Sequence, residues 1–173
     1  MKVALQKGIR KLELAEADRP QAGPGMVVAR VLAAGVCGSD LHRYLHRAEP
    51  QSIPDGHALC GVVVEVGEGV ENVRVGDRVA IDVVTLGRGC GTCDYCRRGN
   101  HVHCAGDRLP FVGGFAEYVR ARAAGFFRLP DTVDEGLGVI AEPVAVGFHA
   151  VRWMRMEPGT SLVILGAGTI GLA

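Results

Sequence analysis

Residues 37–42 read Cys-Gly-Ser-Asp-Leu-His and follow a run of β-branched and small apolar residues at 27–34. The cysteine therefore lies where a predicted strand ends. Much further along the chain, His57 follows a glycine and Glu142 precedes a proline. A thiolate, an imidazole and a carboxylate can together bind zinc and leave the fourth tetrahedral position open to water or substrate. A single cysteine or histidine is more often a core residue, so assigning Cys37 and His57 as ligands depends on the rest of the chain.

A second group of cysteines lies in a glycine-rich loop at residues 85–109, which has few apolar residues with which to build a core. Four thiolates at close spacing can close a tetrahedral structural zinc site and hold such a loop together. Free or disulfide-bonded cysteines are the alternative, but repeated C-x-x-C spacing favours zinc. His101 and His103 are expected to be solvated loop residues. The predicted ligands are Cys90, Cys93, Cys96 and Cys104.

The composition excludes several classes of protein. The 173 residues carry 19 basic and 19 acidic side chains, so no net charge favours nucleic acid or an anionic membrane. The N-terminus lacks the apolar core of a signal peptide, and no apolar run is long enough to span a bilayer. We therefore expect a cytoplasmic protein, in which six cysteines are metal ligands or buried thiols rather than disulfides.

Short apolar runs separated by glycine predict a mainly β protein with some α structure, arranged as a small, partly open barrel. Residues 39 and 40 can cap a short helical turn that extends to residue 45. A helical period begins at Asp134, and Glu142 is expected at a break between two helices, with Pro143 in a first turn. The predicted strands are 2–6 and 9–15 as a hairpin, then 27–34, 59–66, 75–81, 113–120 and 126–130.

The last residues predict the start of a nucleotide-binding unit. Residues 161–165 read as a buried strand and lead into Gly-Ala-Gly-Thr-Ile-Gly at 166–171. In this pattern the glycines, here Gly166, Gly168 and Gly171, let the backbone approach a pyrophosphate at a helix N-terminus. Since a βαβ unit needs about thirty residues or more, we expect a fragment cut inside the first helix of a dinucleotide-binding domain.

Together the motifs resemble the zinc-dependent medium-chain dehydrogenases, the superfamily of alcohol, polyol and threonine dehydrogenases, and the resemblance runs through nearly the whole chain. It rests on Gly-Val-Cys-Gly-Ser-Asp-Leu-His at 35–42, Gly-His-x-x-x-Gly-x-Val-x-x-Val-Gly at 56–67, Val-Gly-Asp-Arg-Val at 75–79, the four-cysteine loop, Gly-Gly-Phe-Ala-Glu-Tyr-Val at 113–119, Glu-Pro at 142–143 and the glycine motif at 166–171.

The resemblance implies a GroES-like, partly open β-barrel as a catalytic domain at residues 1–143, with a zinc lobe at 85–109. Residues 144–173 would then be a connecting helix and the truncated first β-α of a Rossmann domain. It also implies two zinc ions, one catalytic and one structural, and NAD or NADP in the full-length protein. Relatives are dimers or tetramers, so a homo-oligomer is expected.

The resemblance further implies roles for individual side chains. Cys37 and His57 match the ligands of the catalytic zinc, and Glu142 matches an acid that faces this zinc directly or through water. Ser39 and His42 match the residues that relay the substrate proton towards solvent. Asp40 would orient a zinc ligand without binding the metal itself.

Residue 58 departs from the family pattern. Alanine follows His57 where relatives have a glutamate, which puts ligand exchange at the zinc in doubt and gives Glu142 more weight. Cys60, in the following strand, is interpreted as a buried thiol.

The resulting hypothesis is the reversible oxidation of an alcohol or polyol to a carbonyl by NAD(P), with zinc lowering the pKa of the bound hydroxyl. The fragment alone is expected to be inactive. A non-catalytic zinc-binding module is the alternative that the missing glutamate favours. A zinc ribbon that binds nucleic acid is disfavoured by the neutral charge balance.

Overall fold

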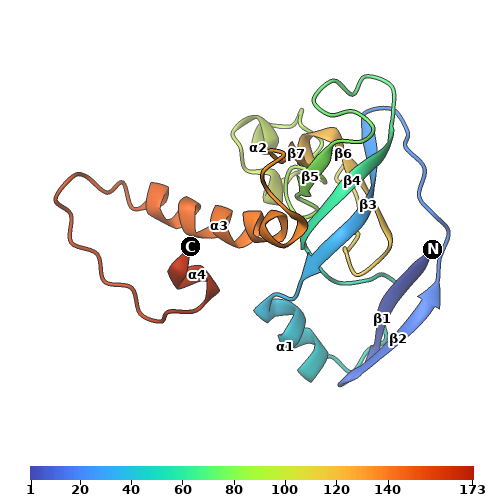
Figure 1. Ribbon diagram of the computed structural model, residues 1–173, viewed down its shortest axis with the longest axis horizontal. Coiled ribbons are helices and arrows are strands. Elements are labelled where there is room, and N and C mark those ends of the chain that lie inside the picture. The colour runs from blue at the N-terminus through green and yellow to red at the C-terminus, as the bar shows by residue number, and fades with distance from the viewer.

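The computed structural model describes residues 1–173 and consists of a curled sheet, a hairpin, a small loop-rich lobe and a long C-terminal helix (Figure 1). The strands are β1 (Lys2–Gly8), β2 (Lys11–Glu16), β3 (Met26–Gly35), β4 (Ala58–Val66), β5 (Arg78–Ile81), β6 (Tyr118–Arg122) and β7 (Phe126–Arg128). The helices are α1 (Gly38–His46), α2 (Asp94–Arg97), α3 (Glu135–Trp153) and α4 (Thr169–Leu172), with short 3₁₀ turns at His101–His103 and Ala123–Gly125.

The main sheet is antiparallel and has the strand order β6-β3-β4-β5-β7. Its two edge strands, β6 and β7, are joined by Ala123–Gly125 alone. Five strands laid flat would put these edges about 19 Å apart, because neighbouring strands are spaced by about 4.8 Å. The chain from Arg122 to Phe126 can reach only about 14 Å. The sheet must therefore curl until its edges approach each other, which gives the partly open barrel expected from the sequence.

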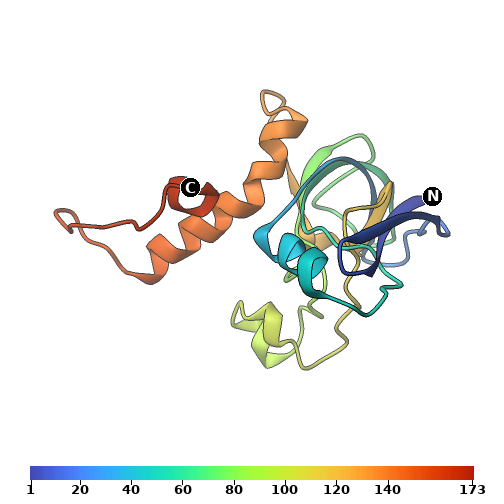
Figure 2. The ribbon, with the colours of Figure 1, turned by 90° about the horizontal axis from the view of Figure 1, so that it is seen from below.

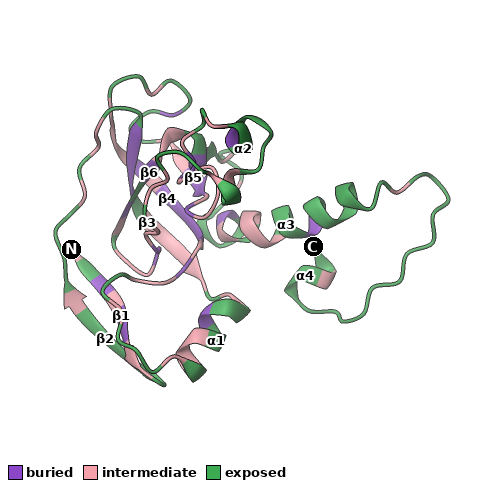
Figure 3. Cartoon of the chain, turned by 180° about the vertical axis from the view of Figure 1, so that it is seen from behind, coloured by how far each residue is buried: buried purple, intermediate pink, exposed green.

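The core lies inside this curled sheet. Val27, Leu59, Val79 and Val119 come from four different strands and are at most 1% exposed. Buried residues are concentrated on the central strands, whereas most of α3 and the residues after it are exposed (Figure 3). Cys60 in β4 is 1% exposed, which confirms the prediction of a buried strand thiol, and its burial raises the pKa of the thiol.

The N-terminal hairpin is confirmed, with β1 paired antiparallel to β2. Three other predicted strands are shorter in the structure. Of residues 126–130, only Phe126–Arg128 form a strand. Of residues 75–81, only Arg78–Ile81 are in the ladder, because Gly76 has a φ of 93° and forms a turn before it. Of residues 113–120, the first part does not belong to β6. Its backbone pairs instead with the loop before β4, where Gly114 N–H donates to Gly56 O and Phe115 N–H to Asp55 O.

The predicted break between two helices at Glu142 is wrong. Helix α3 is continuous from Glu135 to Trp153 and contains Pro143 in its interior. The helix begins at Glu135, and the carboxylate of the preceding residue, Asp134, caps it by accepting a hydrogen bond from the Leu137 amide at 2.8 Å. A proline inside a helix removes one backbone hydrogen bond, and here the helix continues despite that loss. The domain boundary predicted between residues 143 and 144 falls inside this helix and stays a prediction.

The prediction of a buried strand at residues 161–165 is also wrong. These residues form no ladder, and Val163 and Leu165 are 81% and 93% exposed. A strand needs a partner for its backbone groups, and no strand of this chain lies beside them. In Figures 1 and 2, α3 leads away from the barrel and a long loop returns along it to α4. None of the helices combines the length and apolar character needed to cross a bilayer.

Gly61 allows β4 to pass close to β3, because it has no side chain that would meet the backbone of the neighbouring strand. A Cβ at this position would lie 2.5 Å from the Arg30 carbonyl oxygen, which belongs to the backbone and cannot turn aside. We expect Gly61→Ala to reduce the free energy of unfolding by about 2 kcal/mol, as overpacking in a core does. Gly23→Ala is the control, because nothing lies within 4 Å of its Cβ. Urea denaturation of both variants measures the difference, and an equal effect would contradict the explanation.

Candidate metal and catalytic sites

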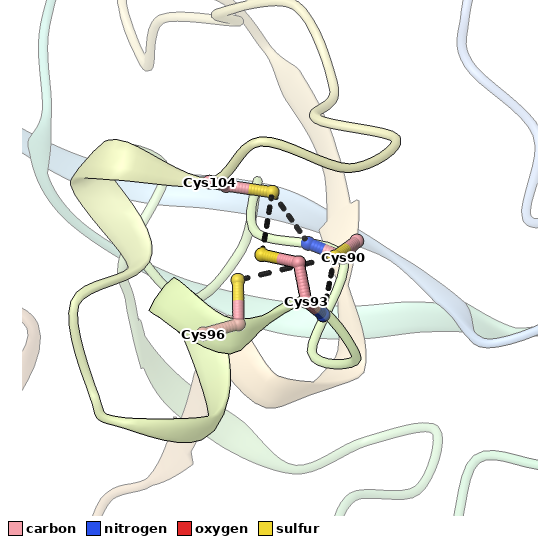
Figure 4. Close-up of side chains that lie close together, drawn as sticks. All are labelled: Cys90, Cys93, Cys96 and Cys104. Carbon is pink, nitrogen blue, oxygen red and sulfur yellow. Dashed lines mark hydrogen bonds between the residues drawn. The ribbon is translucent and has the colours of Figure 1, made fainter.

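The four cysteines predicted to bind zinc meet in the lobe that projects from the barrel (Figure 2). Their sulfur atoms all lie within 4.8 Å of one another, and the Cys90–Cys96 and Cys93–Cys104 sulfurs are 4.0 Å apart (Figure 4). Four sulfurs at about 2.3 Å from one zinc ion would be about 3.8 Å apart. The spacing therefore fits one tetrahedral metal ion with little adjustment.

Hydrogen-bond donors surround these sulfurs in a way that favours thiolates. The Cys90 sulfur accepts from the Thr92 and Cys93 amides at 3.4 and 3.3 Å and from the Thr92 hydroxyl at 3.5 Å. These bonds, the one from the Thr92 hydroxyl most of all, lower the pKa of Cys90 to about 5. Loss of water around Cys96 is the main cause that raises the pKa of its thiol to about 11. A bound metal cation would favour the thiolate at all four positions.

His101 differs from the sequence-based expectation of a solvated residue. Its Nδ1 atom is buried and has no hydrogen-bond partner, whereas His103 is exposed as expected. A Cβ at Gly89 would lie 2.9 Å from this Nδ1 and 3.1 Å from the Cys96 sulfur. Gly89 therefore leaves space for the imidazole beside the cysteine group, and this proximity could not be inferred from spacing along the chain.

A large cavity of about 1060 Å³ lies between the barrel and α3, and three separate segments contribute predicted site residues to it. Ser39 comes from α1, His57 from the residue before β4, and Glu142 from α3. Glu142 is half-buried and lies in the interior of the continuous helix α3. Most of the other lining residues are apolar.

Asp40 connects Cys37 with His57. Its carboxylate is 5% exposed and accepts a hydrogen bond from the Cys37 amide at 2.9 Å. The other carboxylate oxygen lies 3.8 Å from Nδ1 of His57. Arg43 donates to the same oxygen at 2.5 Å and also contacts Asp55 at 2.9 Å. One buried carboxylate thus fixes the first turn of α1 and lies beside the imidazole.

The predicted ligands of the catalytic zinc are not gathered as closely as the four cysteines. Cys37 is half-buried at the start of α1 and does not line the cavity, whereas His57 and Glu142 do. The cysteine group is the one set of three or more such side chains whose ligand atoms already lie close enough to hold a metal ion. Ala58 begins β4 and is 6% exposed.

The predicted proton relay is divided between the cavity and the surface. Ser39 lines the cavity, whereas His42, one turn further along α1, is exposed and does not line it. The rings of His42 and His46 lie with their centroids 4.8 Å apart. Helical spacing alone places Ser39 and His42 on neighbouring positions of one face.

The glycine motif at the C-terminus forms a tight turn before α4. Gly166 has a φ of 103°, a conformation that other residues rarely adopt. A Cβ at Gly171 would meet the carbonyl oxygen of Gly166, so only glycine fits there. Gly168 is the N-cap of α4 and is exposed.

The two arginines of the cavity wall could not be identified from the sequence. Arg43 and Arg47 both come from the end of α1 and line the cavity. The signal in the sequence was their spacing of four residues, which places them one above the other on a helix. That signal is common on solvated helices and gives no indication of the cavity.

Residues 23–131, which include α1, the cavity wall and the cysteine lobe, match the model of the family described as "Alcohol dehydrogenase GroES-like domain".

Individual proteins give a consistent result. Sorbitol dehydrogenase of Bacillus subtilis is 31% identical over 99% of this chain and 50% of its own length. Among solved structures, galactitol-1-phosphate dehydrogenase from Escherichia coli is 34% identical, with a TM-score of 0.84, over 99% of this chain and 50% of its own. A structure described as a short chain alcohol dehydrogenase from Escherichia coli in complex with NADH is 35% identical, with a TM-score of 0.85. The match covers 99% of this chain and 51% of that one. The chain spans about half the length of the curated relatives it matches.

Proposed function

This chain belongs to the alcohol dehydrogenase GroES-like family within the zinc-dependent medium-chain dehydrogenases, and from that premise we propose that it is the catalytic half of an alcohol or polyol dehydrogenase. The proposed reaction oxidises an alcohol to a carbonyl and transfers the hydride to NAD(P). One observation carries the proposal: Ser39, His57 and Glu142, from three distant segments, line one cavity. The similar proteins named for sorbitol and galactitol 1-phosphate favour a polyol carbon chain.

Cys37, His57 and Glu142 are the residues that would hold the catalytic metal. Their thiolate, imidazole and carboxylate form a donor set typical of catalytic zinc. When bound, zinc supplies Lewis-acid chemistry that lowers the pKa of a coordinated hydroxyl. The support in this chain is Asp40, which bonds to the Cys37 amide and lies 3.8 Å from Nδ1 of His57. A carboxylate in that position favours the proton on Nδ1 and leaves Nε2 free to bind the metal.

The chain's own residues would then handle the substrate and its proton. The Ser39 hydroxyl would accept the proton of the substrate hydroxyl inside the cavity and donate its own proton to a hydrogen-bonded chain that leads to His42. His42, exposed on the same helix, transfers it to solvent. The apolar lining of the cavity limits the access of water to the reacting carbon.

The structural zinc and the coenzyme are proposed on other observations. Cys90, Cys93, Cys96 and Cys104 would hold a structural zinc, because their sulfurs already have nearly tetrahedral spacing. The turn at Gly166, Gly168 and Gly171 would contact the pyrophosphate of NAD or NADP in the full-length protein. We further propose a cytoplasmic homo-oligomer that acts on small molecules and binds neither nucleic acid nor membranes.

A non-catalytic zinc-binding module is the second candidate. Ala58 in place of the usual glutamate favours it, as does the looser arrangement of Cys37, His57 and Glu142 relative to the cysteine lobe. In that case the barrel would keep one zinc for stability and would catalyse no hydride transfer.

Metal analysis distinguishes the two functions. We expect two zinc ions per chain in the purified protein and one in Cys37→Ser, because this change removes a ligand of the catalytic site alone. In the full-length protein, Cys37→Ser should also reduce NAD(P)-dependent oxidation of sorbitol by a factor of at least about 1,000, which corresponds to about 4 kcal/mol of transition-state stabilisation. Cys60→Ser is the matched control and should keep both ions. One zinc per chain, unchanged in Cys37→Ser, would support the module and contradict the enzyme.

A further inference from the structure

The two arginines in the wall of the cavity have different electrostatic surroundings. Arg43 is paired twice, with Asp40 at 2.5 Å and with Asp55 at 2.9 Å. Arg47 lines the same cavity and is half-buried, but its guanidinium forms no hydrogen bond or ion pair with any residue of the chain. A guanidinium stays charged at every physiological pH, so the cavity contains one cation without a partner.

Gln6 holds the backbone around Arg47 in place. The Gln6 side chain is 3% exposed, and its amide donates to the carbonyl oxygens of Arg43 and Arg47 at 2.8 and 3.2 Å. The backbone oxygen of Gln6 accepts from the Gln51 amide at 2.7 Å. One buried residue of β1 therefore anchors both the end of α1 and the start of the following loop.

Gln51 adds a second free donor to the same wall. It lines the cavity, and its side-chain amide makes no hydrogen bond within the chain. The Arg47 guanidinium and the Gln51 amide thus start from backbone positions that are fixed by the same glutamine. Two unpaired donors in one cavity wall can recognise an acceptor group of a ligand, and because their backbone is already fixed, only the two side chains have to be ordered on binding.

The carboxylates of the cavity do not neutralise Arg47. Asp55 is paired with Arg43, and Asp82 accepts hydrogen bonds from the amides of residues 84–86. Glu142 makes no ion pair within the chain and, on the proposed function, is directed to the metal. The charge left over on the side of α1 is positive.

We propose that the substrate of this cavity carries an oxyanion, a carboxylate or a phosphate ester, and that Arg47 with Gln51 binds this group while the hydroxyl to be oxidised lies at Ser39 and His57. The proposal rests on the proposed function and specifies its substrate class. Guanidinium groups bind carboxylate and phosphate oxygens through two parallel hydrogen bonds, which fixes orientation as well as affinity. A neutral polyol would leave the guanidinium without a charged partner.

Steady-state kinetics of the full-length protein test this specificity with three substrates of the same carbon chain: a neutral polyol, its sugar acid and its phosphate ester. We expect kcat/KM to favour one of the anionic substrates by about tenfold or more, as for a hydrogen bond to a charged group. The preferred anion tells whether a carboxylate or a phosphate is recognised. In Arg47→Gln, KM for that substrate should rise about tenfold, with kcat changed by less than about twofold, because the contact is made equally in ground and transition states.

Three comparisons keep the test specific. Arg47→Lys should restore part of the affinity, since a charge remains. Arg98→Gln, the same change on an exposed arginine of the cysteine lobe, should have no effect. Binding of inorganic phosphate to wild type, measured by phosphorus NMR and lost in Arg47→Gln, gives a readout that needs no turnover.

Two results would overturn the inference while leaving the dehydrogenase intact. One is a preference for the neutral polyol that Arg47→Gln does not alter. The other is a rise in KM for the coenzyme instead of the substrate in Arg47→Gln, which would assign the arginine to the coenzyme phosphates. Absence of turnover with all three substrates, together with a single zinc insensitive to Cys37→Ser, would instead contradict the proposed function.

Discussion

Replacing Cys96 by serine is expected to remove one zinc ion and to unfold the lobe at residues 85–109 while the barrel stays folded. The lobe has almost no core of its own. Apart from two glycines, Cys96 is its single buried residue, at 4% exposed. Metal binding must therefore supply most of the free energy that orders this segment. Structural zinc sites in small domains contribute about 10–16 kcal/mol, far more than any contact seen in the lobe could replace.

We expect the barrel to stay folded when the lobe unfolds. Its core residues come from the strands, and the cluster around Val27, Leu59 and Val119 contains no residue of 85–109. We expect hydrogen exchange in Cys96→Ser to become fast within 85–109 and to remain slow in β3 and β4. The zinc content should fall from two ions per chain to one.

Cys60→Ser provides the matched control for this prediction. It makes the same chemical change at another buried thiol, 1% exposed, that lies in β4 and outside the cysteine group. It should lower the stability of the barrel but leave the zinc content and the exchange rates of the lobe unchanged. A lobe that stays protected in Cys96→Ser would show that contacts other than the metal hold it together.

The sequence predicted those features that depend on local patterns. Strands β3 and β4 were found because both predicted segments are rich in valine and are followed by glycine. The cysteine group was found because its four members lie within fifteen residues, so that chain geometry alone brings them near one another. Helix α3 begins next to Asp134, where the helical period of the sequence begins.

Features that depend on distant partners could not be predicted in the same way. The pairing of Arg43 with Asp55, and the contact of Gln6 with Arg47, join segments that only the folded barrel brings together. The apolar run at 161–165 has the pattern of a strand but lacks a neighbour to pair with, so pattern and structure disagree. Pro143 also differs from its prediction, because the helix continues through it despite the lost backbone hydrogen bond.

The replacement of Asp40 by asparagine is expected to weaken both the fold and the catalytic metal site. Asp40 is the most buried charged residue of the chain and carries three contacts, with the Cys37 amide, with Arg43 and with His57. Asparagine has nearly the same shape but no charge, so Arg43 would lose one of its two carboxylates. Removing one partner of a fully buried ion pair costs about 3–5 kcal/mol. Because Arg43 is 26% exposed and keeps Asp55, we expect a smaller loss of about 2 kcal/mol.

The effect on the metal should be similar in size to the effect on the fold. Without the carboxylate, Nδ1 of His57 loses the neighbouring negative charge that favours a proton there, and the imidazole is no longer held in the tautomer that binds metal through Nε2. Changes to such supporting residues lower metal affinity by about 10–100-fold. Competition with a chelator should therefore remove one zinc from Asp40→Asn at about 10–100-fold lower chelator concentration than from wild type, whereas the zinc of the cysteine lobe should be released as in wild type.

Asp55→Asn separates the two roles of Asp40. Asp55 is 17% exposed and also pairs with Arg43, so its replacement removes the same kind of charge from the same guanidinium. The Asp55 side chain forms no hydrogen bond with Cys37 and no ion pair with His57. Asp55→Asn should therefore reduce the free energy of unfolding without changing the release of either zinc. Equal zinc release from Asp40→Asn and Asp55→Asn would mean that Arg43, and not the link between Cys37 and His57, controls the metal site. Release from Asp40→Asn alone would mean that one buried carboxylate couples the start of α1 to the metal ligand that precedes β4, across seventeen residues of the chain.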